Sequence, residues 1–242
     1  MRVAVVSDIH ANLHALEAVL AEIDTEQPDE VWCLGDLVGY GPRPNECCRL
    51  VRERATFSLC GNHDLGVLGT IDLADFAGDA GVAARWTRTV LDTEERVWLE
   101  TLAPQGVREG VQLFHASPRD PIWEYVLSDH IALLSLQATT APLVLVGHSH
   151  VPLTVALAGE SFNGGVAAGG TETPLAGARR LMNPGSVGQP RDGDPRAAWL
   201  LLDFDAGIAH FRRTTYDIAQ TQAEITEAGL PQALALRLGP GI

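Results

Sequence analysis

The sequence predicts an α/β fold in which crossover helices connect the strands of a parallel sheet. Apolar runs of strand length alternate with segments of helical periodicity in the first quarter of the chain. The runs lie at residues 2–6, 30–34 and 55–60, and the helical segments at 13–23 and 44–54. This order favours parallel strands, because a parallel pair needs a crossover connection. With 242 residues, 46% of them hydrophobic, we expect one domain spanning residues 1–242.

Both helices in this first part have a recognisable beginning. Aliphatic side chains recur at helical spacing from Leu13 to Ile23, and Asn12 stands where a capping side chain is expected. Pro44 begins the second helix, where a proline is tolerated because first-turn N–H groups have no partner within a helix.

The middle of the chain predicts more helix. Residues 72–103 have the pattern of two packed helices broken near Asp92 and Thr93. We expect residues 65–105 to form a helical insertion that covers the functional site. Helices that only cover one face of the sheet are an equally good interpretation.

The second half of the chain returns to strands. The runs VQLFHA, PLVLVGHSH and AAWLLLDFD have strand length, and residues 128–138 between the first two have a helical pattern. Residues 159–170 are rich in glycine, which predicts an exposed loop or a loose hairpin. Residues 216–228 predict a helix that docks on the core.

Composition narrows the classes of partner. A formal net charge of −14 argues against long DNA or RNA, because nucleic-acid binders carry basic patches that displace counterions. A small phosphate ester remains compatible, since bound metal ions supply local positive charge. We expect no membrane span and no signal peptide, and therefore a cytoplasmic location. No disulfide framework is expected, because none of the four cysteines forms a CxxC pair: Cys33, Cys47, Cys48 and Cys60.

Five polar motifs each follow an apolar run that predicts a strand. Their candidate residues are Asp8 and His10 in SDIH, Asp36 in GD, Asn62 and His63 in GNHD, His115 in HAS, and His148 and His150 in GHSH. Ligands collect beyond the carboxyl ends of parallel strands, so these strands are expected to deliver the side chains to one rim. Each motif alone is weak evidence, since GD and GNHD also suit turns and a lone histidine is more often a core residue. Their joint occurrence at strand ends favours a metal site.

The residue types in these motifs suit divalent transition metals. Asp8 and His10 are two residues apart, as are His148 and His150, and on an extended segment each pair points the same way. Carboxylate and imidazole together favour manganese, iron, zinc or nickel. Two aspartates, one asparagine and four histidines exceed the ligands that one catalytic ion needs, so two ions are expected.

In this order, DxH, GD, GNHD, a later histidine and GHxH resemble the calcineurin-like metallophosphoesterases. The resemblance runs from residue 2 to about residue 203 and is closest to the small YfcE/MJ0936-like phosphodiesterases of bacteria and archaea. It extends to the stretches GDLVGYGPRPNE, WTRTVLDTEERVWLETL, HASPRDP and NPGSVGQPRDG. Every catalytic motif is intact, and Ser149 stands where threonine is common in GHxH.

The resemblance implies a four-layered αββα sandwich with two mixed β-sheets packed face to face. It also implies two divalent ions, manganese or iron with zinc or nickel as alternatives. One ion would take Asp8, His10 and His150, the other Asn62, His115 and His148, with Asp36 bridging both.

The implied activity is hydrolysis of small phosphodiesters by a metal-activated hydroxide, with His63 as the general acid. Asp64 either orients His63 or caps the next helix. Tyr40, Arg119 and Arg191 belong to stretches that resemble the rim loops of the family and are expected to contact substrate. For the two arginines, an exposed or salt-bridged role is an equally good interpretation.

The same fold is also compatible with other functions. A phosphomonoesterase or a phosphoprotein phosphatase would use the same ligands, whereas a non-catalytic scaffold is expected to have lost the acid or several ligands. The expected partner is a small phosphate ester, and a homo-oligomer is compatible with the sequence. Substrate choice is expected in the loops 65–85, 117–127 and 159–175.

Overall fold

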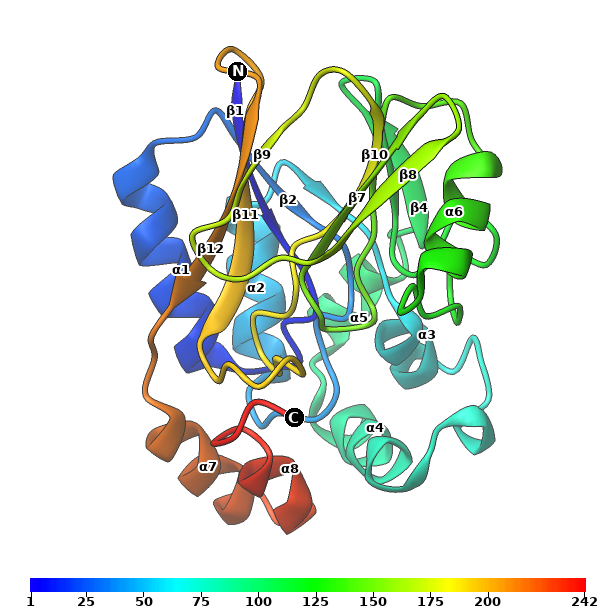
Figure 1. Cartoon of the computed structure of the whole chain (residues 1–242). Coiled ribbons are helices and arrows are strands. Elements are labelled where there is room, and N and C mark those ends of the chain that lie inside the picture. The colour runs from blue at the N-terminus through cyan, green and yellow to red at the C-terminus, as the bar shows by residue number, and fades with distance from the viewer.

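The computed structural model describes residues 1–242 and contains two mixed six-stranded sheets with helices outside them (Figure 1). The first sheet has the order β3 (Phe57–Ser58), β2 (Glu30–Cys33), β1 (Arg2–Val6), β11 (Ala197–Asp203), β12 (Ile208–Thr214) and β9 (Glu172–Pro174). The second has the order β4 (Gln105–Arg108), β5 (Val111–Phe114), β6 (Leu143–Leu145), β10 (Arg179–Asn183), β7 (Leu153–Ala158) and β8 (Ser161–Val166). The predicted four-layered sandwich with two mixed sheets is confirmed.

The parallel strands predicted at the start of the chain form one half of the first sheet. β1 pairs in parallel with β2 in the register Val5 to Trp32, and β2 pairs in parallel with β3. β3 is shorter than the predicted run, with only Phe57 and Ser58 in the ladder. β11 pairs antiparallel with β1, which makes the sheet mixed.

The helices begin and end close to the predicted positions. They are α1 (Leu13–Glu26), α2 (Pro44–Arg54), α3 (Asn62–Leu68), the 3₁₀ turn η1 (Leu73–Asp75), α4 (Gly78–Val90), α5 (Thr93–Leu99), α6 (Asp129–Gln137), α7 (Ile218–Glu227) and α8 (Gln232–Leu236). Asn12 caps α1, as predicted, because its side chain accepts a hydrogen bond from the backbone N–H of Ala15 at 3.2 Å. The predicted break between α4 and α5 lies at Leu91 and Asp92.

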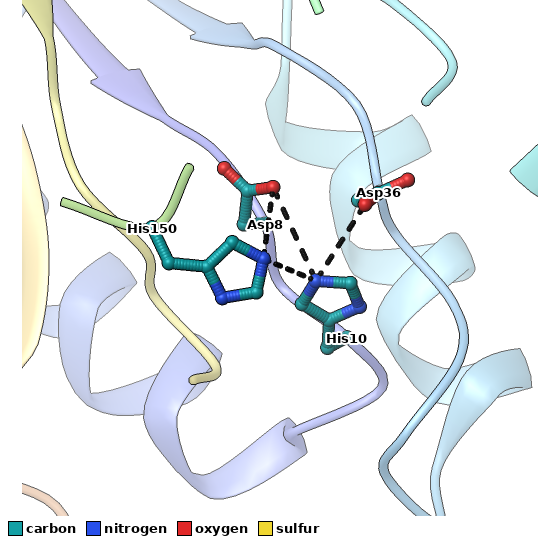
Figure 2. A group of neighbouring side chains, drawn as sticks. All are labelled: Asp8, His10, Asp36 and His150. Atoms are coloured by element: carbon teal, nitrogen blue, oxygen red, sulfur yellow. Dashed lines mark hydrogen bonds and ion pairs between the residues drawn. The ribbon is translucent and has the colours of Figure 1, made fainter. Parts of the chain in front are cut away.

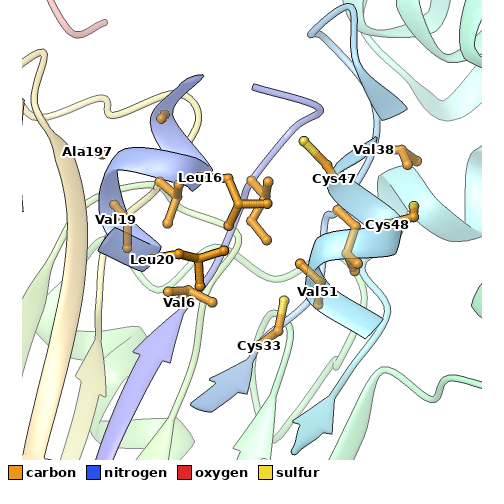
Figure 3. Packing of buried hydrophobic residues seen from close by; sticks show 14 of the residues in the cluster. Val6, Leu16, Val19, Leu20, Cys33, Val38, Cys47, Cys48, Val51 and Ala197 are labelled. Atoms are coloured by element: carbon orange, nitrogen blue, oxygen red, sulfur yellow. The ribbon is translucent and has the colours of Figure 1, made fainter. Parts of the chain in front are cut away.

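Apolar side chains pack on the outer face of the first sheet and between the two sheets. In Figure 3, Leu16 and Val19 of α1 and Val51 of α2 lie over the outer face of the first sheet. Between the sheets, Trp32 and Leu200 of the first pack in one cluster with residues of the second such as Leu113. The alternation along β1 explains this arrangement, because side chains two residues apart point to the same face of a strand.

The C-terminal helices form a separate small cluster. Leu234 of α8 and Ile225 of α7 are buried with Tyr40 and Ala83, so this end of the chain packs on α4 and on the loop after β2. Figure 1 shows α8 and α4 at the same end of the molecule.

Three smaller predictions also have an outcome. The glycine-rich segment belongs to an antiparallel hairpin of β7 and β8. The four cysteines are free and buried. None of the helices combines the length and the hydropathy that a membrane-spanning helix needs.

Candidate metal centre

Polar side chains from five strand ends meet at one edge of the two sheets. They follow β1 (Asp8 and His10), β2 (Asp36), β3 (Asn62 and His63), β5 (His115) and β6 (His148 and His150). Each of these eight residues is at most 4% exposed. The carboxyl ends of the parallel strands therefore bring these side chains to one buried place, as their positions in the sequence predicted.

The backbone is left-handed at five of these eight residues, which corrects the expectation of extended segments. The φ angles are 53° at Asp8, 50° at His10, 53° at Asp36, 63° at His148 and 60° at His150. For residues other than glycine this conformation costs on the order of 1 kcal/mol each, and it persists where surrounding contacts enforce it. One such contact is the hydrogen bond from the His10 N–H to the carbonyl oxygen of Asp36, at 2.9 Å.

The side chains form two groups that share one carboxylate. The ligand atoms of each group lie within 4.8 Å of one another: Asp8, His10, Asp36 and His150 in one, and Asp36, His115 and His148 in the other. Figure 2 shows the four side chains of the first group converging. His148 and His150 therefore serve different groups. The oxygen Oδ1 of Asn62 lies 3.2 Å from Nε2 of His115 and belongs beside the second group.

The hydrogen bonds of His10 and His150 leave two lone pairs facing each other. Nδ1 of His10 lies 3.1 Å from the carbonyl oxygen of Val38, and Nδ1 of His150 lies 2.7 Å from that of Gln189. A carbonyl only accepts, so both Nδ1 atoms donate and both neutral rings present an acceptor at Nε2. These two Nε2 atoms are 3.0 Å apart. A cation between them would turn this repulsion into coordination, and the backbone carbonyls would fix the ring orientations.

Asp36 also places an unpaired acceptor atom close to acceptor nitrogens, and it does so in both groups. Its Oδ2 atom is buried without a hydrogen bond, 3.6 Å from Nε2 of His10 and 3.5 Å from Nε2 of His115. Nδ1 of His115 donates to the carbonyl oxygen of Leu34 at 2.9 Å, so its Nε2 is also an acceptor. A bridging position between two cations fits this oxygen.

Burial disfavours the charged forms of the carboxyl and imidazole groups in this cluster. Burial raises the pKa of Asp8 to about 7, and burial followed by the charge of Asp64 raises the pKa of Asp36. Burial also lowers the pKa values of four imidazoles: His10, His63, His148 and His150. Divalent ions would favour ionised carboxylates and neutral imidazoles. The donor set therefore fits metal ions, with nitrogen and oxygen ligands that suit transition metals.

His63 lies beside the two groups without joining either. Its backbone N–H donates to Oδ1 of Asp36 at 2.9 Å. Its ring centroid lies 4.4 Å from that of Tyr40 and 5.1 Å from that of Phe76. The ring atom Nδ1 is buried without a hydrogen bond, so packing against these aromatic rings holds the imidazole in place.

Asp64 serves the backbone around the site. Its Oδ2 accepts from the N–H of Gly61 at 2.9 Å, and its Oδ1 accepts from the N–H groups of Leu37 and Val38 at 3.0 and 3.1 Å. Of the two roles considered for Asp64, capping of α3 is the one that these contacts show, and it also ties the loop after β2 to this helix.

The three predicted rim residues have different surroundings. Tyr40 is 9% exposed, and its hydroxyl oxygen accepts a hydrogen bond from Nη2 of Arg191 at 3.3 Å. Arg191 also donates to the side chain of Gln189 at 2.9 Å. Arg119 instead pairs with Glu124 at 3.3 Å, which is the salt-bridged alternative.

A cavity of about 1110 Å³ opens beside the metal centre. Seventeen residues line it, among them Asn62, His63, Tyr40, Arg191, Phe76, Trp123, Tyr125, Asp75, Asp79 and Arg237. The segments 65–85 and 117–127 were expected to select substrate, and they supply the aromatic lining residues Phe76, Trp123 and Tyr125. The segment 159–175 supplies no lining residue, and residues 233–242 line the cavity instead. No motif surrounds Arg237, so the sequence carried no signal for it.

The predicted helical insertion contributes to both the site and the core. Residues 75–80 line the cavity. In the same insertion, Ala84, Leu91 and Leu99 are buried in the core over the first sheet. Residues 75–80 therefore lie beside the cavity, whereas these three side chains pack in the core.

This chain is similar to a known protein family, to individual proteins and to solved structures. The model of the calcineurin-like phosphoesterase superfamily domain matches residues 1–207. The uncharacterized protein MJ0912 of Methanocaldococcus jannaschii is 37% identical, over 98% of this chain and 96% of its own. A metallophosphoesterase crystal structure from Sphaerobacter thermophilus is 43% identical, with full coverage of both chains and a TM-score of 0.89. The symmetrical bis(5'-nucleosyl)-tetraphosphatase of Actinobacillus pleuropneumoniae serotype 3 is 35% identical, over 29% of this chain and 27% of its own.

Proposed function

The chain belongs to the calcineurin-like phosphoesterase superfamily, and from this premise we propose that it hydrolyses small phosphodiesters with two divalent metal ions and His63 as the general acid. One observation carries the proposal. The buried Oδ2 atom of Asp36 has no hydrogen bond and lies between Nε2 atoms of two histidines, 3.6 and 3.5 Å away. A carboxylate in that position suits a bridge between two ions.

The ligands follow from the two groups of side chains. Asp8, His10 and His150 would hold one ion, and Asn62, His115 and His148 the other, with Asp36 shared. When bound, two such ions neutralise charge on a phosphoryl group and lower the pKa of water. Manganese or iron is the proposed native metal, with zinc or nickel as alternatives.

His63 supports the acid role through its position. It lines the cavity that opens beside the metal centre, together with Asn62. Its neighbour Asn62 is a proposed ligand, so a phosphate bound at the ions would lie close to the imidazole. Protonation of the leaving oxygen by a side chain of this kind contributes about 10²–10⁴-fold to a rate. The intact acid and ligands also count against a scaffold of the same fold.

The test measures hydrolysis of bis(p-nitrophenyl) phosphate and of glycerophosphocholine with added manganese, because an alkoxide leaving group needs a proton whereas p-nitrophenolate leaves without one. The His63→Ala variant is expected to lose about 10²–10⁴-fold in kcat for glycerophosphocholine while its manganese content, measured by mass spectrometry, equals that of the native protein. The matched control is His130→Ala, because His130 is an exposed histidine at the start of α6 and its loss should leave kcat unchanged.

Two outcomes would overturn the proposal. One is the absence of metal-dependent turnover for any phosphate ester, and the other is native kcat of His63→Ala for glycerophosphocholine, whose leaving group needs a proton. Parallel assays with p-nitrophenyl phosphate and a phosphopeptide distinguish a phosphomonoesterase or a phosphoprotein phosphatase, since a higher kcat/KM for either would replace the diester assignment.

A further inference from the structure

We propose that the cavity beside the metal centre binds the nucleoside diphosphate part of the substrate, so that the substrate is an ester of a nucleoside diphosphate. This inference rests on the proposed phosphodiesterase function, because it places the ester phosphate at the metal centre. It adds a second phosphate site at Arg191 and Arg237 and an aromatic site at Phe76 and Trp123.

The size of the cavity is the first argument. Its volume of about 1110 Å³ lies slightly above the range for small-molecule sites, roughly 300–1000 Å³. A single phosphate with a short alcohol would leave most of this space to water. His63 and Asn62 line the cavity, so a group that extends from the metal centre enters it directly.

Two arginines supply the second argument. The guanidinium carbon of Arg191 lies 5.8 Å from the ring centroid of Tyr40, and that of Arg237 lies 4.7 Å from the same centroid. Arg191 donates to the neutral side chains of Tyr40 and Gln189, and Nε of Arg237 is buried without a hydrogen bond. Burial, and then the charge of Arg191, lower the pKa of Arg237. Both arginines line the cavity, so an anion bound there would offset this repulsion, and phosphate matches the donor geometry of a guanidinium group.

The position of Tyr40 joins this arginine pair to the metal centre. Its ring centroid lies 4.6 Å from that of His10 and 4.4 Å from that of His63. The ring of Tyr40 therefore connects the two arginines with the proposed ligand His10 and the proposed acid His63. That spacing suits a phosphate next to the one that is cleaved, which a nucleoside diphosphate ester provides.

Aromatic side chains form the remaining wall. The rings of Phe76 and Trp123 meet edge to face at 5.4 Å between centroids. Tyr125 stacks on His148 at 4.1 Å with 16° between the planes, and 45% of Tyr125 is exposed. A nucleobase stacks on such side chains because every base has a π-face. Asp75 and Asp79 also line the cavity, and their carboxylates can accept hydrogen bonds from ribose hydroxyls.

Arg237 lies outside the segment that matches the family model. The family model ends at residue 207, whereas Arg237 follows α8 near the end of the chain. The small cluster of α7 and α8 with Tyr40 holds this helix against the cavity. The specificity for a second phosphate is therefore assigned to the C-terminal helices.

The test measures binding by isothermal titration calorimetry on the manganese-loaded full chain, with ADP, AMP and inorganic pyrophosphate as probes. ADP is expected to bind at least tenfold tighter than AMP, which lacks the second phosphate, and than pyrophosphate, which lacks the base. Arg237→Gln should weaken ADP about tenfold and leave AMP within twofold. Phe76→Ala should weaken ADP and AMP alike and leave pyrophosphate unchanged.

The controls separate this inference from misfolding and from the proposed function. Arg85→Gln removes an exposed arginine of α4 and should leave all three affinities unchanged. Arg237→Lys keeps the charge and should restore part of the ADP affinity. Equal affinity for ADP and AMP, or an equal loss of both in Arg237→Gln, would overturn the nucleotide subsite while bis(p-nitrophenyl) phosphate turnover still supports the enzyme. Absent turnover with selective ADP binding would overturn the proposed function alone.

Discussion

Gly61 occupies the position in the metal centre where a single added carbon should do the most harm. A Cβ at this residue would overlap Oδ1 of Asp36, and it would lie 2.5 Å from Cε1 of His115 and 2.7 Å from Cγ of Asp36. The φ angle of Gly61 is −110°, which alanine adopts without strain, so the clash is the whole effect. Separating these atoms requires a shift of about 1 Å, enough to cost about 10²-fold in a catalytic rate.

We therefore expect Gly61→Ala to fold with reduced stability and to lose its metal-dependent functions. Overpacking costs about 1–3 kcal/mol, which lowers Tm by roughly 2–12 °C in a chain of this size. The assays are manganese content, the rise of Tm on adding manganese, and kcat for bis(p-nitrophenyl) phosphate. Gly81→Ala in α4 is the control, because its Cβ meets no atom closer than 3.5 Å and alanine favours a helix. Native manganese content and native kcat in Gly61→Ala would refute the proposed geometry of Asp36 and His115.

Three further perturbations test the metal, the charges and the core. Removing metal with a chelator should lower Tm by roughly 5–10 °C if free metal is near 100 times its Kd, since ligand binding then adds about 2.7 kcal/mol; an unchanged Tm in differential scanning calorimetry would contradict a buried metal centre. Glu224→Gln should cost about 2 kcal/mol at neutral pH, because hydrogen bonds from Arg43 and His14 hold the pKa of Glu224 at about 2 instead of 4.5. That stabilisation is complete above pH 4.5 and is lost as the pH falls toward 2, so urea titrations should show the native and variant stabilities converging across that window. Leu113→Ala should cost about 2–5 kcal/mol by leaving a cavity between the sheets, and a loss below 1 kcal/mol in the same titrations would contradict the packing described there.

Local features of the sequence determined much of the fold. The alternation of strand and helix patterns up to residue 60 predicted the parallel half of the first sheet. Asn12 and Pro44 marked the beginnings of α1 and α2, because capping and first-turn chemistry depend only on neighbouring residues. The antiparallel partners β11 and β12 join the sheet from the far end of the chain, and no local pattern states which strands will pair.

The same division holds for the functional site. The residue types and their place at strand ends identified the eight candidate residues, since chemistry of this kind needs carboxylates, an amide and imidazoles together. The family resemblance already assigned His148 and His150 to different ions, but only the tertiary structure showed that the backbone is left-handed at both residues, in place of the extended one that their spacing suggested. It also placed Arg237, 197 residues beyond Tyr40 in the sequence, over the ring of that tyrosine. The packing of α7 and α8 on the body of the protein decides that contact, and it depends on apolar side chains that could have packed elsewhere.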